Sequence, residues 1–447
     1  MARQMSLKDR LAKARGDAAE MEKLYRQACD SSEKPLFRDA IAQCAAERSD
    51  DILLSAWLHR LDLQSSPSNS GSASSGRRKQ VRHWSAAVGT SVGLGIAFAL
   101  LTGEQPPVPI PGEGASQFWI GWAPLTALCV LAFLVAVNCQ PEDFRRVGLL
   151  GLVLLALAVL VVSMAWNRTD DVARLIALHL PFAAWALVGA GVALEKGEAT
   201  RQQYAFLVKS VEALLAGAVY FVAGAIFLGL TNGIFGVLGI ELPESALRLV
   251  TAWGLGAVPI LALASVYDPT ALPVMQDWTS GLSRILRLLT RIFLPLALGV
   301  LVVYVFWFIP SNFWHPFHER EVLIIYNATI LGLLLLLSLS AVEPVSGGGP
   351  LLRHALLALA VLTALLNAYA LAANGTRIFE LGLTPNRYAV AGWNLVTLLM
   401  LSTVIVRLWR AEPRHWVAPL RRGIALASVL AVVWSVWVVL GLPLSYL

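Results

Sequence analysis

The chain has 447 residues, of which 57% are hydrophobic and 14% are charged, whereas soluble domains have about 45–50% apolar and about 25% charged residues. This composition excludes an ordinary soluble domain and an intrinsically disordered chain. The formal net charge of +6 is unevenly placed: residues 1–83 carry fifteen Lys+Arg and eleven Asp+Glu, whereas residues 84–447 carry twenty and eighteen. In the membrane part the basic residues gather in the loops, which reports on membrane topology, and no nucleic-acid partner is expected. The sequence has no phosphate-binding loop, zinc-protease motif, nucleophile elbow or dinucleotide fingerprint, and therefore predicts no cofactor.

Residues 1–64 are predicted to form a small cytoplasmic helical domain. Ser6, Ser32 and Ser49 can each cap a helix in which apolar residues recur at spacings of three and four. The region lacks the short apolar core and small-residue cleavage site of a signal peptide. The lipid bilayer is the partner of the rest of the chain, and this domain is available to a protein partner.

Residues 65–83 are assigned to a flexible linker and a basic juxtamembrane segment. The linker proper, SSPSNSGSASSG, has too little apolar content to fold. The basic cluster that follows the linker consists of Arg77, Arg78, Lys79 and Arg82. A cluster of this kind attracts anionic lipid by about 1 kcal/mol per residue, and it also fits the ordinary anchor at the cytoplasmic face of the membrane.

Residues 84–447 are predicted to form an all-α polytopic transmembrane helix bundle. A helix needs about 20 apolar residues to cross a bilayer, and runs of that length indicate about eleven spans. The predicted spans are 84–102, 118–137, 147–166, 172–194, 208–230, 247–266, 292–309, 322–342, 351–373, 388–408 and 424–443.

Basic residues gather in every second loop, and this pattern predicts the orientation. The loops assigned to the cytoplasm contain Arg145, Arg146, Lys196, Arg201, Arg284, Arg287, Arg291, Arg410, Arg414, Arg421 and Arg422. The other loops contain only Arg168, Arg320, Arg377 and Arg387. The positive-inside rule therefore predicts a cytoplasmic N-terminus, and an odd number of spans places the C-terminus on the extracytoplasmic side.

Residues 377–395, RIFELGLTPNRYAVAGWNL, connect the end of one predicted span to the start of the next. The Gly-Leu-Thr-Pro-x-Arg core at 382–387 resembles the bacterial membrane family DUF4153, and the resemblance covers roughly the membrane part from residue 84 onward. It implies a multi-pass protein of the bacterial inner membrane and brings no established activity or catalytic residue. The N-terminal domain lies outside it.

Ionisable residues inside a bilayer are costly, so four of them are candidate ligand-binding residues. His179, in the fourth span, is expected to relay protons or to hydrogen-bond a neighbouring helix. Glu212 is either a transport carboxylate or the partner of Lys209, three residues earlier. Arg248 and Asp268 lie at the two ends of the sixth span, and an Asp before Pro is also a common turn former.

Glycines in two spans allow a transporter-like interpretation. Gly93 and Gly95 lie in the first span, and Gly254 and Gly256 lie in the sixth. With spans 1–5 and 6–10 as two opposed halves, these positions correspond, as they do where interrupted helices form a substrate site. Glycine is also frequent in uninterrupted membrane helices, and the sequence leaves both interpretations open.

The external loop 310–321 carries metal-ligand residue types at short spacing. His315, His318 and Glu319 are weak candidates for a metal site. Pro316 restricts the geometry between the two histidines, and the neighbouring aromatic residues fit anchoring at the membrane interface. Interface anchoring is the favoured interpretation.

The second external loop contributes four further candidate ligand-binding residues: Arg377, Glu380, Asn386 and Arg387. Thr384 is expected to cap the tenth span, which places Arg387 in its first turn, where the helix dipole disfavours a cation. An anionic partner is therefore expected, either a bound ligand or an acidic residue such as Glu380. The alternative is a structural pair of Arg377 with Glu380.

Three functions fit these features. The first is transport or permeation of a small solute or a lipid-linked molecule. The second is a non-catalytic membrane scaffold or sensor that couples the external loops to the N-terminal domain. The third, a membrane-embedded transferase, is the one enzyme among them and needs a carboxylate or histidine at the outer face. Charged residues that converge on a cavity would favour transport, and a dry, leucine-filled bundle would favour the scaffold.

Overall fold

The computed structural model describes residues 11, 17–30, 34–47, 51, 53–54, 56–58, 61, 70–102, 117–138, 148–158, 160, 170–193, 199–278, 281–342, 349–413 and 415–445. These residues are almost entirely helical and include no β-strand, which confirms the predicted all-α fold. The chain separates into two compact units, residues 1–81 and 82–447, and each is described by itself.

The N-terminal unit is built around its own aromatic core. Helices α2 (Ala18–Asp30) and α3 (Lys34–Glu47) bring together Tyr25, Phe37 and Trp57, whose ring centroids lie 5.4–6.2 Å apart. Spacings of this size are typical of favourable aromatic pairs. The small unit therefore has a hydrophobic core of its own.

Two aspartates cap helix starts in the described part of this unit. Asp17 Oδ1 accepts a hydrogen bond from the backbone N–H of Glu20, and Asp51 Oδ1 accepts from the N–H groups of Leu53 and Leu54. Both aspartates thus cap helix starts. The predicted caps Ser6, Ser32 and Ser49 lie outside the described residues.

Helix α5 (Ser70–Thr102) begins inside the segment that composition assigns to a flexible linker. Residues 70–76 are helical, so that part of the linker prediction is wrong. Extending an existing helix costs less than nucleating one. The apolar span that follows therefore extends its helix into a polar segment with little helical preference of its own.

Ten helices are long and apolar enough to cross a membrane within the described ranges, and they match ten of the eleven predicted spans. Besides α5 they are α6 (Gln117–Asn138), α8 (Asp170–Ala193), α9 (Ala199–Val237), α10 (Glu244–Val266), α11 (Gly281–Val303), α14 (Arg320–Leu339), α15 (Pro350–Leu381), α16 (Pro385–Arg410) and α17 (Val417–Val436). Single π-helical turns, η2 (Tyr304–Phe308) and η4 (Trp437–Gly441), extend α11 and α17.

The remaining predicted span, 147–166, is represented by the shorter helix Gly148–Ala158. Its Leu157 packs on Ile176 in the first part of α8, whereas a Cβ atom added to Gly191 at the far end of α8 would lie 2.9 Å from Leu150 Cδ1. This helix therefore runs antiparallel to α8. That direction is the one the predicted third span, 147–166, requires.

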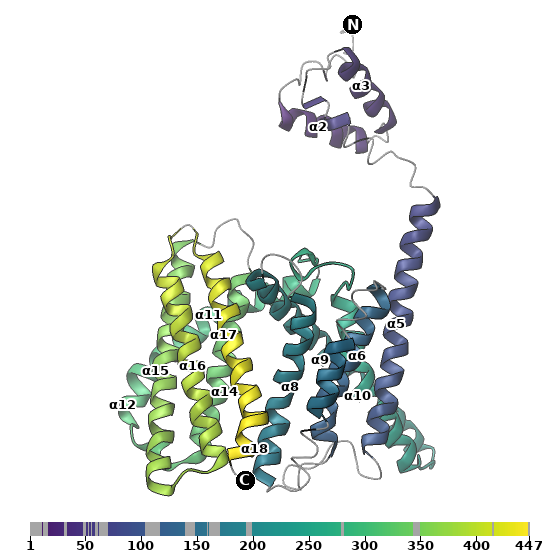
Figure 1. Cartoon of the computed structure of the whole chain (residues 1–447). Coiled ribbons are helices and arrows are strands. Elements are labelled where there is room, and N and C mark those ends of the chain that lie inside the picture. The colour runs from purple at the N-terminus through teal and green to yellow at the C-terminus, as the bar shows by residue number, and fades with distance from the viewer. Residues whose placement is uncertain are drawn as a thin grey trace. The chain divides into compact units, whose positions relative to one another are not determined.

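The starts of α6 and α8 and the end of α17 lie on the same side of the bundle. Ile120 of α6, Ile176 of α8 and Val439 of η4 share one buried cluster. In Figure 1 the C-terminal end of the chain reaches this side, beside the starts of α8 and α16. α9, α15 and α17 begin on the opposite side.

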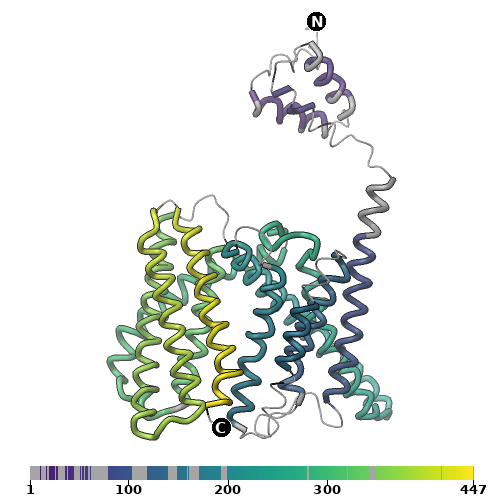
Figure 2. The backbone as a smooth tube through the Cα atoms, in the orientation of Figure 1, coloured from purple at the N-terminus to yellow at the C-terminus, as the bar shows by residue number. Residues whose placement is uncertain are grey.

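The membrane unit has two main hydrophobic cores. One is formed by α5, α6, α8 and α10, and the other by α11, α14, α15, α16 and α17. α9 belongs to both, because Phe206 packs in the first core while Tyr204 and Val208 pack in the second. Figure 2 follows this helix between the two groups. The first turns of α9 therefore lie at the boundary between them.

Helices α5 and α10 are continuous, which agrees with the ordinary interpretation of their glycines and not with interrupted helices. The glycines instead allow the two backbones to approach: a Cβ atom added to Gly256 would lie 2.6 Å from the Gly95 backbone nitrogen. Small residues at crossings of membrane helices have this role. Nothing lies within 4 Å of a Cβ atom added to Gly93 or Gly254.

Candidate functional site

A buried ion pair lies on the first half of α9. Lys209 Nζ is 2.7 Å from Glu212 Oε2, and the side chains have exposed fractions of 2% and 0%. The pair predicted from their spacing is confirmed. Because a buried charge is tolerated only when it is paired and hydrogen-bonded, the surrounding groups decide whether the pair is fully satisfied.

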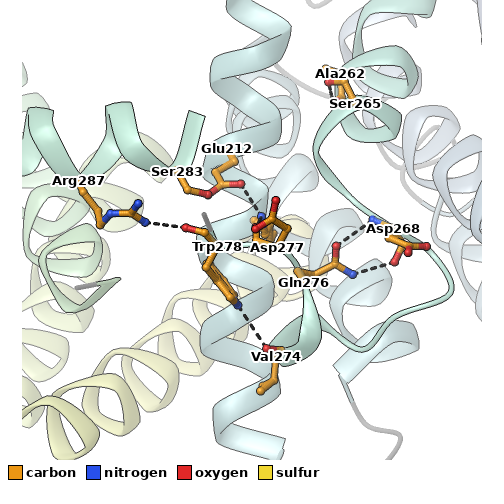
Figure 3. Close-up of polar contacts among 11 residues, drawn as sticks. Glu212, Ala262, Ser265, Asp268, Val274, Gln276, Asp277, Trp278, Ser283 and Arg287 are labelled. Atoms are coloured by element: carbon orange, nitrogen blue, oxygen red, sulfur yellow. Dashed lines mark hydrogen bonds and ion pairs between the residues drawn. The ribbon is translucent and has the colours of Figure 1, made fainter. Parts of the chain in front are cut away.

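Groups from outside α9 complete this cluster (Figure 3). Lys209 Nζ also donates to the backbone carbonyl of Asp277 at 2.6 Å and lies 4.8 Å from the Trp278 ring centroid. The Ser283 hydroxyl on α11 donates to Glu212 Oε1. We call these five residues the Lys209 cluster. It satisfies both charges and ties α9 to the chain segment that leads into α11.

The segment between α10 and α11 is held by a second set of hydrogen bonds. The Gln276 side chain accepts from the Asp268 backbone N–H at 2.8 Å and donates to the Asp268 carbonyl at 2.8 Å. Gln202 on α9 accepts from the backbone N–H of Val274 at 3.2 Å, and Arg287 donates to the Trp278 carbonyl at 2.7 Å. The buried amides Gln202 and Gln276 thus fix this loop against α9 and α11.

Asp268 forms a turn, which is the structural interpretation of the Asp-Pro pair. Its exposed carboxylate accepts from the backbone N–H of Thr270 at 2.9 Å and from the Thr270 hydroxyl at 2.7 Å. Burial, and then the nearby Asp268 carboxylate, raise the pKa of the Tyr267 phenol. Tyr267 therefore stays neutral at physiological pH.

Sequence reasoning missed Gln202, Gln276, Trp278 and Ser283. Ser283 lies 71 residues from Glu212, and Gln202 lies 72 residues from Val274. No spacing rule joins positions so far apart. The one readable signal was the i, i+3 relation of Lys209 and Glu212.

The other intramembrane candidates do not join this cluster. His179 Nδ1 lies 2.8 Å from the Leu175 carbonyl of its own helix, and its ring meets Trp393 of α16 edge-on at 6.3 Å. The expected hydrogen bond to a neighbouring helix is therefore replaced by a ring contact. Arg248 is half-buried near the start of α10, at the opposite end of that helix from Asp268.

The outer motif provides a structural partner for Arg387. Its guanidinium donates to the carbonyls of Leu381 and Gly382, both at 2.8 Å, where α15 ends at a glycine with φ of 81°. Thr384 Oγ1 accepts from the Arg387 backbone N–H, and Pro385 opens α16, as predicted. The expected anionic partner is thus the negative end of the α15 dipole.

The remaining residues of this motif do not form an ion pair in the part of the chain that the structure describes. Arg377 donates to the His318 carbonyl at 3.3 Å, and Glu380 is exposed. The expected pair of Arg377 with Glu380 is not formed. Asn386 is half-buried in the first turn of α16.

The histidines of the other external loop have protein partners. His315 Nε2 lies 3.0 Å from Glu319 Oε1, and His318 Nδ1 lies 2.9 Å from the Trp314 carbonyl. Among the described residues, no group of three or more His, Cys, Asp or Glu side chains is arranged to hold a metal ion. The His315–Glu319 pair is exposed, so this loop gives the transferase hypothesis little support.

A cavity of about 160 Å³ lies between α9 and three helices of the second core, α14, α16 and α17. We call it the α9 cavity. Its wall includes Val208, Leu337, Val404 and Ile424. A smaller cavity beside Lys209 holds only about 10 Å³, which is roughly the space of a single water molecule.

Polar groups at the α9 cavity are already satisfied. The Tyr204 hydroxyl donates to the Ser338 carbonyl at 3.0 Å, and Gln203 donates to Ser428 Oγ at 2.9 Å. The Arg421 guanidinium lies 5.5 Å from the Tyr204 ring centroid. The cavity therefore has a mostly apolar wall, and Arg421, which lies outside its lining, contacts one of the lining residues, Tyr204, and donates to the Ala341 carbonyl.

Comparisons with protein-family models, with curated proteins and with solved structures find no match to this chain.

Proposed function

We propose that this integral membrane protein binds the apolar chain of a lipid-linked molecule in the α9 cavity and transports that molecule across or within the membrane. The cavity itself carries this proposal. Apolar cavities of about 150 Å³ accept apolar guests of the size of benzene, and the exposed Leu335 in the wall of this one shows that it opens to the surface of the bundle. A bilayer supplies acyl and isoprenoid chains as the abundant apolar ligands, and sites between helices of a bundle commonly bind ligands.

The charge around the cavity fits a lipid-linked molecule better than a free polar solute. Arg201 and Arg422 are exposed on the first turns of α9 and α17, at the same end of the bundle as Arg421. Arginines at this end of the bundle, near the membrane surface, attract anionic headgroups. His179, Glu212, Arg248 and Asp268 do not line the cavity, and none of the described residues that line it is charged, so the cavity itself fits an apolar chain better than a charged solute.

Filling the cavity tests this function. Ala427 lines it, whereas Leu426 on the same helix turn is exposed. Purified protein is analysed for retained lipid by native mass spectrometry after detergent exchange. Ala427→Phe is expected to lose the retained lipid, and Leu426→Phe is expected to keep it. Equal lipid retention by both variants, or absence of lipid from the unmodified protein, would overturn the proposal.

A second function, a membrane scaffold or sensor, is favoured by the separate aromatic core of the N-terminal unit. Under this function the N-terminal unit binds a protein partner, and the helix bundle either transmits a signal to that unit or anchors it at the membrane. A chain lacking residues 1–64 distinguishes the two. Transport predicts that lipid movement persists in vesicles containing the shortened chain, whereas the scaffold predicts that the cellular phenotype disappears while lipid retention is unchanged.

We further propose a bacterial inner-membrane location with a cytoplasmic N-terminus, as the DUF4153 resemblance and the positive-inside rule imply. Support comes from the side of the bundle on which α9 and α17 begin, which carries Arg201, Arg421 and Arg422. In a cysteine-free background, Asn312→Cys is expected to react with a membrane-impermeant reagent in intact cells, and Glu412→Cys is expected to react only after permeabilisation. The reverse pattern would refute the orientation.

A further inference from the structure

Four polar side chains near the middle of α14, α15 and α16 have hydrogen-bonding atoms without a partner. These atoms are Asn327 Oδ1, Asn367 Oδ1, both side-chain atoms of Asn394, and Thr397 Oγ1. The exposed fractions of Asn367, Asn394 and Thr397 are 0%, 1% and 1%. We call this group the midplane site. Its members are neutral, so the high cost of burying a charge in the membrane does not single them out in the sequence.

Contacts between the helices place these residues at one level. Asn367 Nδ2 donates to the Asn394 carbonyl at 2.7 Å, which joins α15 to α16. Thr397 is one helical turn beyond Asn394 on the same buried face. The ring centroids of Tyr326 and Tyr369 lie 6.0 Å apart, which sets Asn327 of α14 level with Asn367.

An unpaired polar group in the hydrocarbon region is costly. Leaving a buried donor or acceptor unsatisfied costs about 1–3 kcal/mol, and the bilayer core offers no water as a substitute. Neighbouring polar side chains on the same helix pair avoid this cost: Thr363 donates to the Leu359 carbonyl, and Asn374 donates to the Arg387 carbonyl.

Ser91 Oγ, Trp122 Nε1 and Trp434 Nε1 also lack a partner, but each is the single such buried atom on its helix among the described residues. The midplane site differs because it gathers five such atoms on α14, α15 and α16, and it therefore calls for a bound species.

The chemistry of the unpaired atoms indicates what is bound. Four of the five are oxygens, so acceptors outnumber donors. A divalent cation normally takes carboxylate oxygens, and the midplane site contains none. Monovalent cations, in contrast, are held in membranes by neutral oxygens that replace their hydration shell.

We propose that Asn327, Asn367, Asn394 and Thr397 form a binding site for a monovalent alkali cation at the middle of the membrane. The Asn394 amide can turn so that its oxygen faces the ion. The proposal is independent of the lipid function, because the α9 cavity is lined by none of these residues. An ion bound here would stabilise the packing of α14, α15 and α16.

Thermal unfolding of the purified full chain in detergent tests the site directly. The melting temperature is measured while choline chloride is replaced by lithium, sodium or potassium chloride at constant ionic strength. A saturable rise is expected with at least one alkali cation. Choline is too large to enter and serves as the reference for a general salt effect.

Two threonines provide a matched pair of variants. Thr397→Val removes an unpaired buried hydroxyl, and Thr363→Val removes one that is paired, while both threonines have an exposed fraction of 1%. Thr397→Val is expected to weaken cation binding roughly tenfold or more, the scale on which a metal site responds to loss of a supporting group. Thr363→Val is expected to leave it unchanged.

Asn394→Leu gives a second, opposite signature. It is expected to abolish the cation response and yet to be at least as stable as the unmodified chain in choline, because the unpaired amide is gone. Identical melting temperatures of the unmodified chain in all four salts would mean that the site holds ordered water only and would overturn the proposal. Equal cation responses of Thr397→Val and Thr363→Val would also overturn it, even if Asn394→Leu failed to fold.

Discussion

Replacing Lys209 by methionine is expected to destabilise the membrane unit more than replacing Glu212 by leucine. Both side chains are buried, with exposed fractions of 2% and 0%, so water does not screen their interaction. Removing one partner of a buried ion pair costs about 3–5 kcal/mol, because the other charge is left uncompensated. The two losses differ because the surviving charges have different surroundings.

Without Lys209, the Glu212 carboxylate keeps the Ser283 hydroxyl as its donor. Without Glu212, the Lys209 ammonium keeps the Asp277 carbonyl and the Trp278 ring. A hydrogen bond to a charged group is worth about 1.5–3 kcal/mol, and a desolvated cation–π contact about 2 kcal/mol. The loss in free energy of unfolding is therefore expected near the upper end of the range of about 3–5 kcal/mol for Lys209→Met, and near or below its lower end for Glu212→Leu.

The double variant, Lys209→Met with Glu212→Leu, is expected to recover most of the loss. Apolar residues that replace both members of a buried ion pair are often neutral or stabilising. The Asp277 carbonyl and the Ser283 hydroxyl lose one partner each, which limits the recovery. The double-mutant cycle should thus show strong coupling between the two positions.

Unfolding in mixed micelles of a mild detergent and SDS, followed by the helical circular dichroism signal, measures these differences. Ser265→Ala is the control, since the Ser265 side chain is exposed and its hydroxyl donates to the Ala262 carbonyl of its own helix. It should change the free energy of unfolding by no more than about 0.5 kcal/mol. Single losses that simply add in the double variant would refute the assignment of a coupled buried pair.

Two further substitutions test the helix ends and crossings by thermal unfolding in detergent. Arg387→Ala should lower the free energy of unfolding by about 1–2 kcal/mol, since it removes the cap on α15, whereas Glu380→Ala should change it by less than about 0.5 kcal/mol; equal losses would contradict the cap. Gly256→Ala should cost about 1–3 kcal/mol through the clash with Gly95, whereas Gly254→Ala, in open space, should be neutral or stabilise by up to about 1 kcal/mol. A neutral Gly256→Ala would contradict the close crossing of α5 and α10.

The sequence predicted those features that depend on near neighbours in the chain. Long apolar runs predict spans because the bilayer imposes a minimum length, and ten of them appear as helices. The Thr384 cap, the Asp268 turn and the Lys209–Glu212 pair all involve residues within three positions of each other. Local geometry alone decides such contacts.

Features that depend on tertiary packing could not be predicted in this way. The sequence placed Arg387 against the dipole of its own helix but could not show that the end of α15 lies beside it. It flagged Gly256 as a point of helix weakness, whereas the structure uses the missing side chain for contact with Gly95. In both cases the residue was correctly selected and its partner was unknown, because the partner belongs to another helix.

The distribution of satisfied and unsatisfied polar groups separates anchoring from binding in this bundle. Charged side chains are the most costly groups to bury in a membrane. Lys209 and Glu212 are nevertheless fully satisfied by their partners, and they therefore act as an anchor between α9 and α11. A site that exchanges a ligand must keep some of its own polar atoms unpaired when empty. Asn394 meets this condition, and it lies on α16, away from the Lys209 cluster on α9 and α11. Ligand exchange is therefore expected where amides are unpaired, and the Lys209–Glu212 ion pair should keep its geometry while a ligand binds or leaves.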